Sequence, residues 1–344
     1  MSATRVTVTG ATGHLGSNLV RSLLERGDHV RILMRSPERP ESIAGLDLDI
    51  VEGDVRDNVA VRRAVAGSEM VFHLAAQISI TGPMGGLVHD VNVNGAANVA
   101  RQCLAKGVRR MVHVCSIHAF SQTPLSEPLD ETRARVTKGR APAYDVSKAE
   151  GEAEIRRVVA EGLDAVIVHP SAIIGPNDFA PSRVGKVLLD LYRKKLPGLV
   201  PGGFNWVDAR DVVRGILEAA ERGRTNESYL LGGHWHSVKS LAAIAESITG
   251  VAPPRFSSPM WLAQIGAPFM QLWANLTHQE PLYTSEALVA LRANRDYDLG
   301  KAESELGYRP RPTEETVRDT YRWFAENGRL PESLLERIEA QSAP

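Results

Sequence analysis

The residues TGATGHLG, positions 9–16, form a glycine-rich loop between two segments of different hydrophobic pattern. The preceding run VTVTG, residues 6–10, is typical of a strand, and the following run, residues 14–27, has the apolar spacing of a helix. The loop contains Gly10, Gly13 and Gly16. Glycine allows positive φ and a close approach of the backbone, and the first turn of a helix offers free N–H groups to a phosphate. A strand, a glycine loop and a helix in this order predict a dinucleotide-binding unit.

Short apolar runs and amphipathic runs alternate from this loop to about residue 176. The apolar runs are rich in Val and Ile and cover residues 6–10, 29–35, 48–54, 70–76, 110–116 and 164–176. The amphipathic runs cover residues 14–27, 59–67, 91–107 and 144–162. Such alternation is typical of parallel sheets, and continuous apolar strands indicate a sheet that is covered on both faces. We therefore predict an α/β fold, a Rossmann-type doubly wound parallel sheet with a smaller, mostly helical C-terminal domain.

The pattern loosens after Pro176, where prolines and glycines cluster at residues 196–203 and 251–254. A further helical run at residues 209–223 is expected to return to the first domain. We expect residues 1–172, together with about 207–224, to form the dinucleotide-binding domain. Residues of about 173–206 and 225–344 are then expected to form the substrate-binding domain.

Composition excludes several classes of protein. The formal net charge of −1 argues against a nucleic-acid partner. Cys103 and Cys115 are the only cysteines, so we expect two reduced, buried thiols rather than a disulfide scaffold. The start MSATRVTVTG has none of the features of a signal peptide. These features together predict a cytoplasmic protein.

A stable membrane span is not expected, because no run reaches the roughly 20 apolar residues that a spanning helix needs. The nearest candidate, residues 261–273, is interrupted by Gly266 and Pro268. We expect this segment to form a buried helix or the wall of a pocket. Contact with a membrane surface is the alternative.

The stretch YDVSK places Tyr144 and Lys148 four residues apart in a helical run, so both side chains share one face. A neighbouring positive charge favours the ionised form of a phenol and lowers its pKa. Ser116 ends the strand-like run RMVHVCS, residues 110–116. Ligands of open parallel sheets bind outside the carboxyl ends of the strands, where Ser116 is expected.

Six stretches in order resemble the extended branch of the short-chain dehydrogenase/reductase superfamily, the NAD-dependent epimerase/dehydratase type. They are TGATGHLG, GDVRD (53–57), FHLAA (72–76), VNVNGAANV (91–99), YDVSK and IIGPND (173–178). The resemblance continues to residues 306–324. The stretch HPSAIIGP is most similar to dihydroflavonol-reductase-like and 3β-hydroxysteroid-dehydrogenase-like proteins, whereas sugar enzymes of the family commonly have an Arg where this chain has His169-Pro170.

The resemblance implies that Ser116, Tyr144, Lys148 and Asn92 are catalytic. Tyr144 is expected to act as general acid, Ser116 to hydrogen-bond the substrate oxygen and Asn92 to support a proton path. A shift of register by one would put Ile117 at the serine position, and the alternative for Asn92 is a helix-start cap or a polar neighbour. No metal site is expected.

NADP(H) is the favoured cofactor and NAD(H) is possible. The second strand is followed by Arg35 and Ser36, and a guanidinium there accommodates the 2′-phosphate of NADP(H). The resemblance further implies that Asp54 and Val55 meet the adenine and that Leu74 to Ala76 pass beside the ribose. The backbone around Ser171 to Ile173 is expected to meet the carboxamide. The expected cofactor contacts are Gly10, Thr12, Gly13, His14, Leu15, Gly16, Arg35, Ser36, Asp54, Val55, Leu74, Ala75, Ala76, Tyr144, Lys148, Pro170, Ser171 and Ile173.

These residues predict a reductase that transfers a hydride from NADPH to a small-molecule ketone or aldehyde, or the reverse reaction on an alcohol. The apolar residues Phe179, Leu199, Phe204 and Trp206 suit a hydrophobic substrate and equally suit a domain core. A nucleotide-sugar epimerase or dehydratase and a non-catalytic NAD(P)-sensing protein are the alternatives. Family members dimerise through helices that resemble those at 91–107 and 144–162, so a homodimer is expected.

Overall fold

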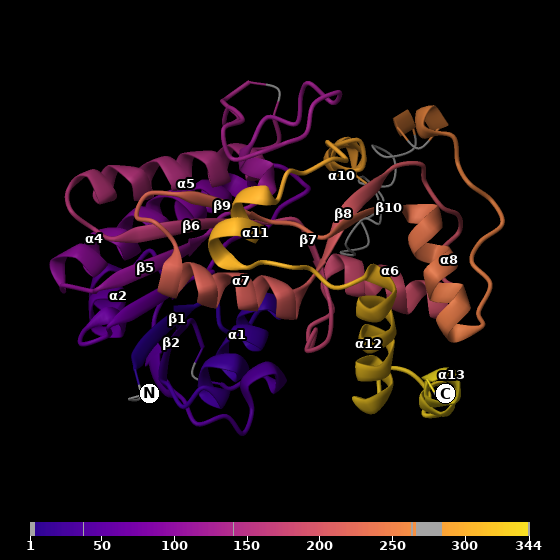
Figure 1. The fold of residues 1–344 in the computed structure, drawn as a ribbon, viewed down its shortest axis with the longest axis horizontal. Helices are drawn as coiled ribbons and strands as arrows, with labels where there is room; N and C mark the ends of the chain where they lie inside the picture. Colours follow the sequence, from indigo (N-terminus) through magenta and orange to yellow (C-terminus); the bar gives the residue numbers. More distant parts are fainter. Residues whose placement is uncertain (1–3, 37, 140, 263, 266–283, 343–344) are drawn as a thin grey trace.

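The computed structural model describes residues 4–36, 38–139, 141–262, 264–265 and 284–342. Its centre is a seven-stranded sheet in the order β3–β2–β1–β4–β5–β6–β9 (Figure 1). Each neighbouring pair of strands runs parallel. The strands are β1 Arg5–Thr9, β2 His29–Met34, β3 Asp49–Glu52, β4 Met70–His73, β5 Arg110–Val114, β6 Ala165–Pro170 and β9 Ser228–Leu231. The predicted Rossmann-type doubly wound sheet is confirmed.

Helices cover both faces of this sheet. One face carries α2 Asn58–Val65, α4 Ala96–Ala105 and α5 Ala143–Ala160, and the other carries α1 His14–Glu25, α7 Ala209–Arg222 and α11 Gly300–Leu306. Successive side chains of a strand point to opposite faces of the sheet, and those of β4 fill the cores on both faces. Its Met70 and Phe72 enter the core beneath α1 and α7, whereas Val71 enters the core beneath α4 and α5.

The strand order reverses between β1 and β4, which lie side by side although β2 and β3 separate them in the sequence. A crevice forms at such a switch point because the connections leave the sheet in opposite directions. The glycine loop after β1 and the segments after β4 and β5 lie at this edge. The edge is therefore the expected place for the cofactor and substrate.

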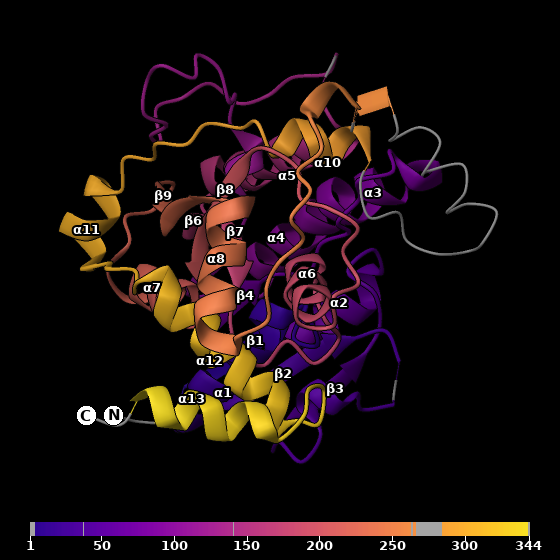
Figure 2. The ribbon, with the colours of Figure 1, turned by 90° about the vertical axis from the view of Figure 1, so that its right-hand side faces the viewer.

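A second, smaller sheet lies beside the first, in the order β10–β8–β7. Its strands are β7 Ala172–Ile174, β8 Gly203–Asp208 and β10 His234–Ser237, and the helices around it are α6 Arg183–Tyr192, α8 Val238–Thr249, α10 Ser285–Ala290, α12 Thr313–Glu326 and α13 Ser333–Ser342. Figure 2 shows α8, α12 and α13 from their own side of the molecule. Phe179, Leu199, Phe204 and Trp206 lie in or against the core of this region, so they serve packing.

Strand β9 lies within the range 225–344 that we predicted for the substrate-binding domain, yet it pairs with β6 in the large sheet. Helix α11 lies in the same range, and its Ala302 and Leu306 belong to the core beneath α7. The large sheet thus extends past the boundary predicted at residue 224, because β9, which consists of four buried residues after α7, forms its last strand. The division of the rest of the chain into two domains stays a proposal.

The remaining elements are short. They are the one-turn helices η1 Glu41–Ile43, η2 Met84–Gly86, α3 Leu87–His89 and η4 Ile117–Ala119 and the π-helix η3 Asp90–Gly95. Among the helices of the described residues, each is too short or too polar to cross a bilayer. Most of the segment 261–273, for which we predicted a buried helix, a pocket wall or a membrane contact, lies outside the described residues.

Candidate active site

The glycine loop after β1 is held closely against the end of β4. Gly10 has φ +76°, and a Cβ atom there would lie 2.7 Å from the Ala75 nitrogen. A Cβ atom at Gly16 would lie 2.1 Å from the Gly10 oxygen. Gly13 differs, because its φ is −77° and a Cβ atom would make only an ordinary contact of 3.5 Å. The bare backbone at Gly13 instead leaves space before the first turn of α1, which fits the approach of a pyrophosphate.

His14 begins α1, but its side chain points to the loop after β7. Its Nε2 lies 3.0 Å from the Pro176 oxygen and its Nδ1 lies 3.9 Å from Asp178 Oδ1. The predicted cofactor contact of His14 can therefore come only from its main chain. Thr12 uses its carbonyl oxygen to accept a hydrogen bond from Ser42, and Leu15 packs against the core beneath α1.

Two arginines, Arg35 and Arg56, lie just after the ends of β2 and β3. Arg35 and Ser36 are exposed directly after β2. The Asp54 carboxylate accepts hydrogen bonds from Arg56 Nε at 2.8 Å and Nη2 at 3.0 Å. These bonds lower the pKa of Asp54, and the nearby charge of Arg35 acts in the same direction. The sequence analysis missed Arg56, although it stands two residues after Asp54 in GDVRD.

Two further segments border the same crevice. Leu74 and Ala75 continue beyond β4, and their N–H groups donate to the carbonyl and hydroxyl oxygens of Thr9. Ala76 follows and is exposed. Val55 is buried, and its carbonyl oxygen accepts a hydrogen bond of 2.7 Å from Asn98. Val55 is therefore held rigidly against α4, where it can form one wall of the crevice.

Ser116, Tyr144 and Lys148 meet at the carboxyl end of β5. The Ser116 Oγ accepts a hydrogen bond from the His118 N–H at 3.2 Å, which caps η4. The Ser116 side chain also lies near enough to the Tyr144 phenol to lower the pKa of that phenol. Lys148 lies one turn after Tyr144 on α5, and its Nζ donates to the Val114 carbonyl oxygen at 2.9 Å. The residue at the serine position is thus Ser116 in this arrangement, and Ile117 is buried in a separate apolar cluster.

Burial governs the proton affinities of these groups in the protein alone. Burial raises the pKa of the Tyr144 phenol above its usual value, while the nearby Ser116 side chain acts in the opposite direction. Burial also lowers the pKa of the Lys148 ammonium. In the protein without its cofactor, removal from water therefore outweighs the attraction of nearby charge at this phenol.

Asn92 lies in the π-helix η3 and connects two segments near α5. Its Oδ1 accepts a hydrogen bond from the Gln77 N–H at 2.7 Å, and its Nδ2 donates to the Gln77 oxygen at 3.0 Å and to Ser147 Oγ at 2.9 Å. A Cβ atom at Gly151 would lie 2.3 Å from the main-chain carbonyl oxygen of Asn92, so α5 packs directly on this turn. The Asn92 side chain is thus a bridge rather than a helix cap.

The chain leaves the large sheet for the small one just after β6. Pro170 ends β6 and is buried, and Ile173 lies in β7 opposite Val207. Ser171 joins the two sheets, because its Oγ donates to Asn205 Oδ1 at 2.9 Å. The sequence analysis missed Asn205, since no motif marks a single asparagine in a strand of the second sheet.

His118 lies beside the phenol. Its Nδ1 is 3.4 Å from Asp145 Oδ1, and its ring centroid is 6.2 Å from that of Tyr144. Both side chains are partly exposed, with exposed fractions of 23% for His118 and 16% for Asp145. His118 therefore borders the space in front of the phenol, where a substrate would lie.

Behind Ser116 lies a buried cluster of Cys115, Glu152 and His169, whose potential ligand atoms are within 4.8 Å of one another. The Glu152 carboxylate accepts hydrogen bonds from both Arg135 and Arg156. Two guanidinium groups at the same carboxylate would repel a divalent cation, so the cluster fits hydrogen bonding rather than metal binding. Glu152 could have been noticed in the sequence, because it follows Lys148 by four residues.

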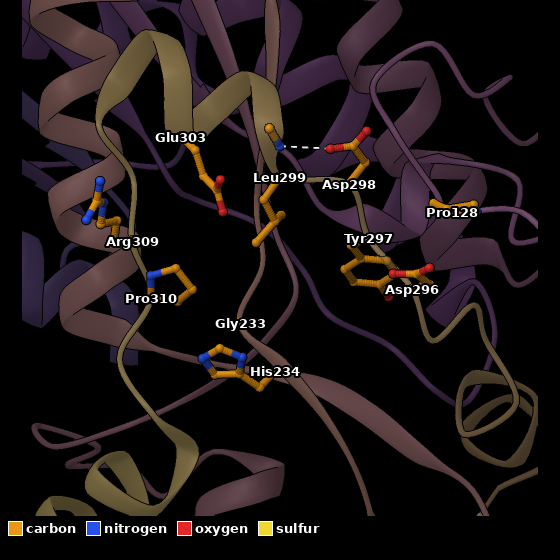
Figure 3. Close-up of a pocket in the computed structure, with 11 residues that line it drawn as sticks. Pro128, Gly233, His234, Asp296, Tyr297, Asp298, Leu299, Glu303, Arg309 and Pro310 are labelled. Atoms are coloured by element: carbon orange, nitrogen blue, oxygen red, sulfur yellow. Dashed lines mark hydrogen bonds between the residues drawn. The ribbon is translucent and has the colours of Figure 1, made fainter.

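A hollow of the described structure lies elsewhere. It has a volume of about 750 Å³ and is lined by residues of β10 and of the segment 296–310, among them His234, Tyr297 and Arg309 (Figure 3). Asp298 at its rim accepts a hydrogen bond from the Gly300 N–H and so serves to begin α11. Neither the glycine loop nor Tyr144 lines this hollow, so we do not place the reaction there.

Comparison with known proteins agrees with this geometry. The NAD dependent epimerase/dehydratase family matches residues 6–232. This span contains the glycine loop and the three residues that meet at the end of β5.

Individual relatives match nearly the whole chain. Sterol demethylase protein B from Methylococcus capsulatus is 34% identical over 328 residues, which cover 94% of this chain and 99% of that protein. A putative dihydroflavonol 4-reductase from Synechocystis is 33% identical over 330 residues, which cover 93% of this chain and 94% of that protein. The crystal structure of gox2253 has a TM-score of 0.81 at 32% identity and covers 94% of this chain and 99% of its own.

Proposed function

The chain belongs to the NAD-dependent epimerase/dehydratase family, the extended branch of the short-chain dehydrogenases/reductases, and from this premise we propose that it reduces a ketone or aldehyde with NADPH. It is an NAD(P)-dependent oxidoreductase. The observation that carries the proposal is the meeting of Ser116, Tyr144 and Lys148 at the carboxyl end of β5. A hydroxyl, a phenol and an ammonium at one sheet edge are suited to the transfer of a proton to a substrate oxygen.

Each residue of the site has its own role in the proposed reaction. When bound, the nicotinamide cofactor supplies a hydride to the carbonyl carbon. Tyr144 donates its phenolic proton to the carbonyl oxygen, so that the products are an alcohol and a phenolate. Ser116 hydrogen-bonds the same oxygen and stabilises the negative charge that develops on it. Lys148 carries a positive charge on the same helix face and favours the phenolate until a proton returns.

The residues of the crevice fit a dinucleotide. The open space at Gly13 and the free N–H groups of the first turn of α1 suit a pyrophosphate. The exposed guanidinium of Arg35 has no hydrogen-bond partner among the described residues, whereas that of Arg56 is bonded to Asp54. A free guanidinium beside the ribose site supports NADPH over NADH, because it can form two parallel hydrogen bonds with a 2′-phosphate.

The substrate that we propose is small to medium in size and largely hydrophobic. Support comes from the names of two relatives that match the chain along its length, a sterol demethylase component and a putative dihydroflavonol reductase. His169, where sugar enzymes commonly have an Arg, is fully buried and bonded within the protein. It therefore cannot reach a sugar nucleotide.

A panel of substrates tests the proposal. The purified protein is incubated with NADPH and hydrophobic ketones, and then with nucleotide sugars, while absorbance at the nicotinamide band and the products are followed. We expect net oxidation of NADPH by at least one ketone. Conversion of a sugar without net change in cofactor would support an epimerase or dehydratase instead, and tight binding without conversion would support a sensing protein. Tyr144→Phe should keep cofactor binding and lose most of the turnover, and full turnover in this variant would refute the role of Tyr144.

A further inference from the structure

His169, at the end of β6, contacts the main chain of Ser116 from behind. The ring is fully buried, its Nδ1 lies 3.2 Å from the Ser116 carbonyl oxygen and its Nε2 lies 3.0 Å from Ser228 Oγ. A carbonyl oxygen can only accept a hydrogen bond, so Nδ1 must carry the hydrogen. Burial lowers the pKa of His169 to about 4, so the ring is neutral at pH 7. Nε2 therefore accepts its hydrogen bond from the Ser228 hydroxyl.

Ser228 is itself held by two guanidinium groups. Its Oγ accepts hydrogen bonds from Arg135 Nη2 at 3.2 Å and from Arg156 Nη2 at 2.8 Å. Both guanidinium groups are fixed by the Glu152 carboxylate, at distances of 2.8 to 2.9 Å. The hydrogen bonds all run in one direction: the arginines donate to Ser228, Ser228 donates to His169, and His169 donates to the carbonyl of Ser116. We call these five residues the Glu152–His169 chain.

The Glu152–His169 chain begins on the helix that carries the phenol. Tyr144, Lys148 and Glu152 are four residues apart along α5, so they lie on one face of it. Burial alone would raise the pKa of Glu152, but the hydrogen bonds and charges of Arg135 and Arg156 hold it below its usual value, and the carboxylate stays ionised. One end of the chain is thus anchored to α5 and the other end reaches Ser116.

Packing holds the middle of the chain in place. The ring of Phe120 lies 4.6 Å from that of His169, between centroids, and the Arg135 guanidinium lies 3.8 Å above the Phe120 ring. His169 therefore has little freedom to turn away from Ser116. The bond from His169 fixes the carbonyl at the position from which the Ser116 side chain extends.

We propose that His169 is a positioning residue, which, through the Glu152–His169 chain, holds Ser116 in register with Tyr144 for the reduction. The inference rests on the proposed function, because it assumes that the Ser116 hydroxyl binds the substrate oxygen. His169 itself contacts neither substrate nor cofactor. Misplacement of a catalytic group by about 1 Å can cost on the order of 100-fold in rate, so loss of the bond should be measurable in kcat.

The direction of the hydrogen bonds can be measured without turnover. Protein labelled with ¹⁵N-histidine is studied by NMR at pH 7 without cofactor, and the His169 signals are assigned from their loss in His169→Asn. We expect a neutral ring with its hydrogen on Nδ1. A hydrogen on Nε2, or a doubly protonated ring, would overturn the inference.

A double-mutant cycle tests the positioning role itself. His169→Leu should lower kcat about 10- to 100-fold, with KM and the Kd for NADPH changed less than about threefold. In a Ser116→Ala background the same change should cost less than about threefold, because the hydroxyl that His169 positions is already absent. His169→Asn should recover most of kcat, since its amide N–H can take the place of Nδ1–H.

Two further variants test whether a drop in kcat comes from the lost hydrogen bond or from a general loss of stability. His113→Leu is the matched control, because His113 is a buried histidine on the neighbouring strand whose ring nitrogens have no hydrogen-bond partner in the described structure. We expect it to keep kcat within about threefold. Ser228→Ala removes only one hydroxyl, so it should fold even where His169→Leu does not, and it should lower kcat in the same non-additive way.

The outcomes separate the two proposals. If Ser116→Ala keeps full turnover, the proposed role of Ser116 in the reaction fails, whatever the NMR result. If Ser116→Ala lowers turnover but His169→Leu and Ser228→Ala cost as much with the alanine as without it, the positioning role fails and the proposed function stands.

Discussion

The Lys148 ammonium nitrogen lies 2.9 Å from the carbonyl oxygen of Val114, the last residue of β5. The bond is buried, with Lys148 4% exposed. It connects the helix that carries Tyr144 to the strand that leads to Ser116. The bond therefore helps to fix the position of the phenol relative to the hydroxyl.

Lys148→Met should lower kcat about 100-fold or more. The change keeps the length of the side chain but removes both the positive charge and the donor to Val114, which leaves a buried carbonyl without its partner. The measurement is NADPH oxidation with an accepted ketone, together with the melting temperature. Lys138→Met makes the same change at an exposed lysine, and it should leave kcat unaltered. A Lys148→Met protein that folds and turns over normally would contradict this account of the site.

The glycines of the first loop should respond to alanine in two different ways. Gly16→Ala places a Cβ atom 2.1 Å from the Gly10 oxygen, so we expect loss of folding or a large drop in melting temperature. Gly13→Ala makes no such clash, so it should fold normally. Its methyl group would occupy the space before α1, and the Kd for NADPH should rise at least 10-fold. Titration of cofactor fluorescence and thermal unfolding give the two readouts. Tight NADPH binding by Gly13→Ala would exclude this loop as the pyrophosphate site.

The parts of the fold that local pattern determines were predictable. Helix α5 was predicted at 144–162 and spans Ala143–Ala160, because a helical pattern of apolar residues is a local property of the sequence. Strand β9 was missed, since its four residues, Ser228–Leu231, are too few to show a period. Only pairing with β6 makes this segment a strand.

The candidate site likewise contains features that the local sequence predicts and features that it does not. The loop glycines and the spacing of Tyr144 and Lys148 are visible in the sequence, because each lies within a single turn or loop. The contacts of the Glu152–His169 chain are not visible, since His169 and Ser228 are 59 positions apart and Arg156 reaches Ser228 over 72 positions. Such bonds depend on which strands become neighbours, which no local pattern specifies.

Arg35→Ala should reduce the preference for NADPH over NADH about 10-fold or more. The exposed guanidinium at the end of β2 would lose its bonds to a 2′-phosphate, whereas NADH has no such group to lose. The ratio of kcat/KM for the two cofactors measures the effect. Arg39→Ala is the matched control, because Arg39 is also exposed after β2 but donates to the Leu46 carbonyl. An unchanged ratio in Arg35→Ala would overturn the cofactor preference.

Acid should destabilise the protein, and the buried His169 should contribute to this loss alongside His73 and His113, whose pKa values burial also lowers. Burial lowers the folded-state pKa of His169 to about 4 from its usual 6.5. Below pH 6.5 the unfolded chain therefore binds a proton that the folded chain does not, and stability falls as the pH drops towards 4. Between pH 7.5 and pH 5 this histidine accounts for about 2 kcal/mol of lost stability.

The buried His73, whose pKa burial lowers to about 3, adds to the same slope in the wild-type protein and in a His169 variant alike. Urea unfolding at the two pH values should thus show a smaller loss of stability in His169→Leu than in the wild type. His29→Ala is the control. Because His29 is exposed, this variant should lose as much stability between the two pH values as the wild type does. Because Glu152 has a pKa of about 2, its ionisation affects stability only at lower pH, as the carboxylate gains its proton. A His169→Leu protein that loses as much stability as the wild type would show that the ring is not held neutral in the folded state.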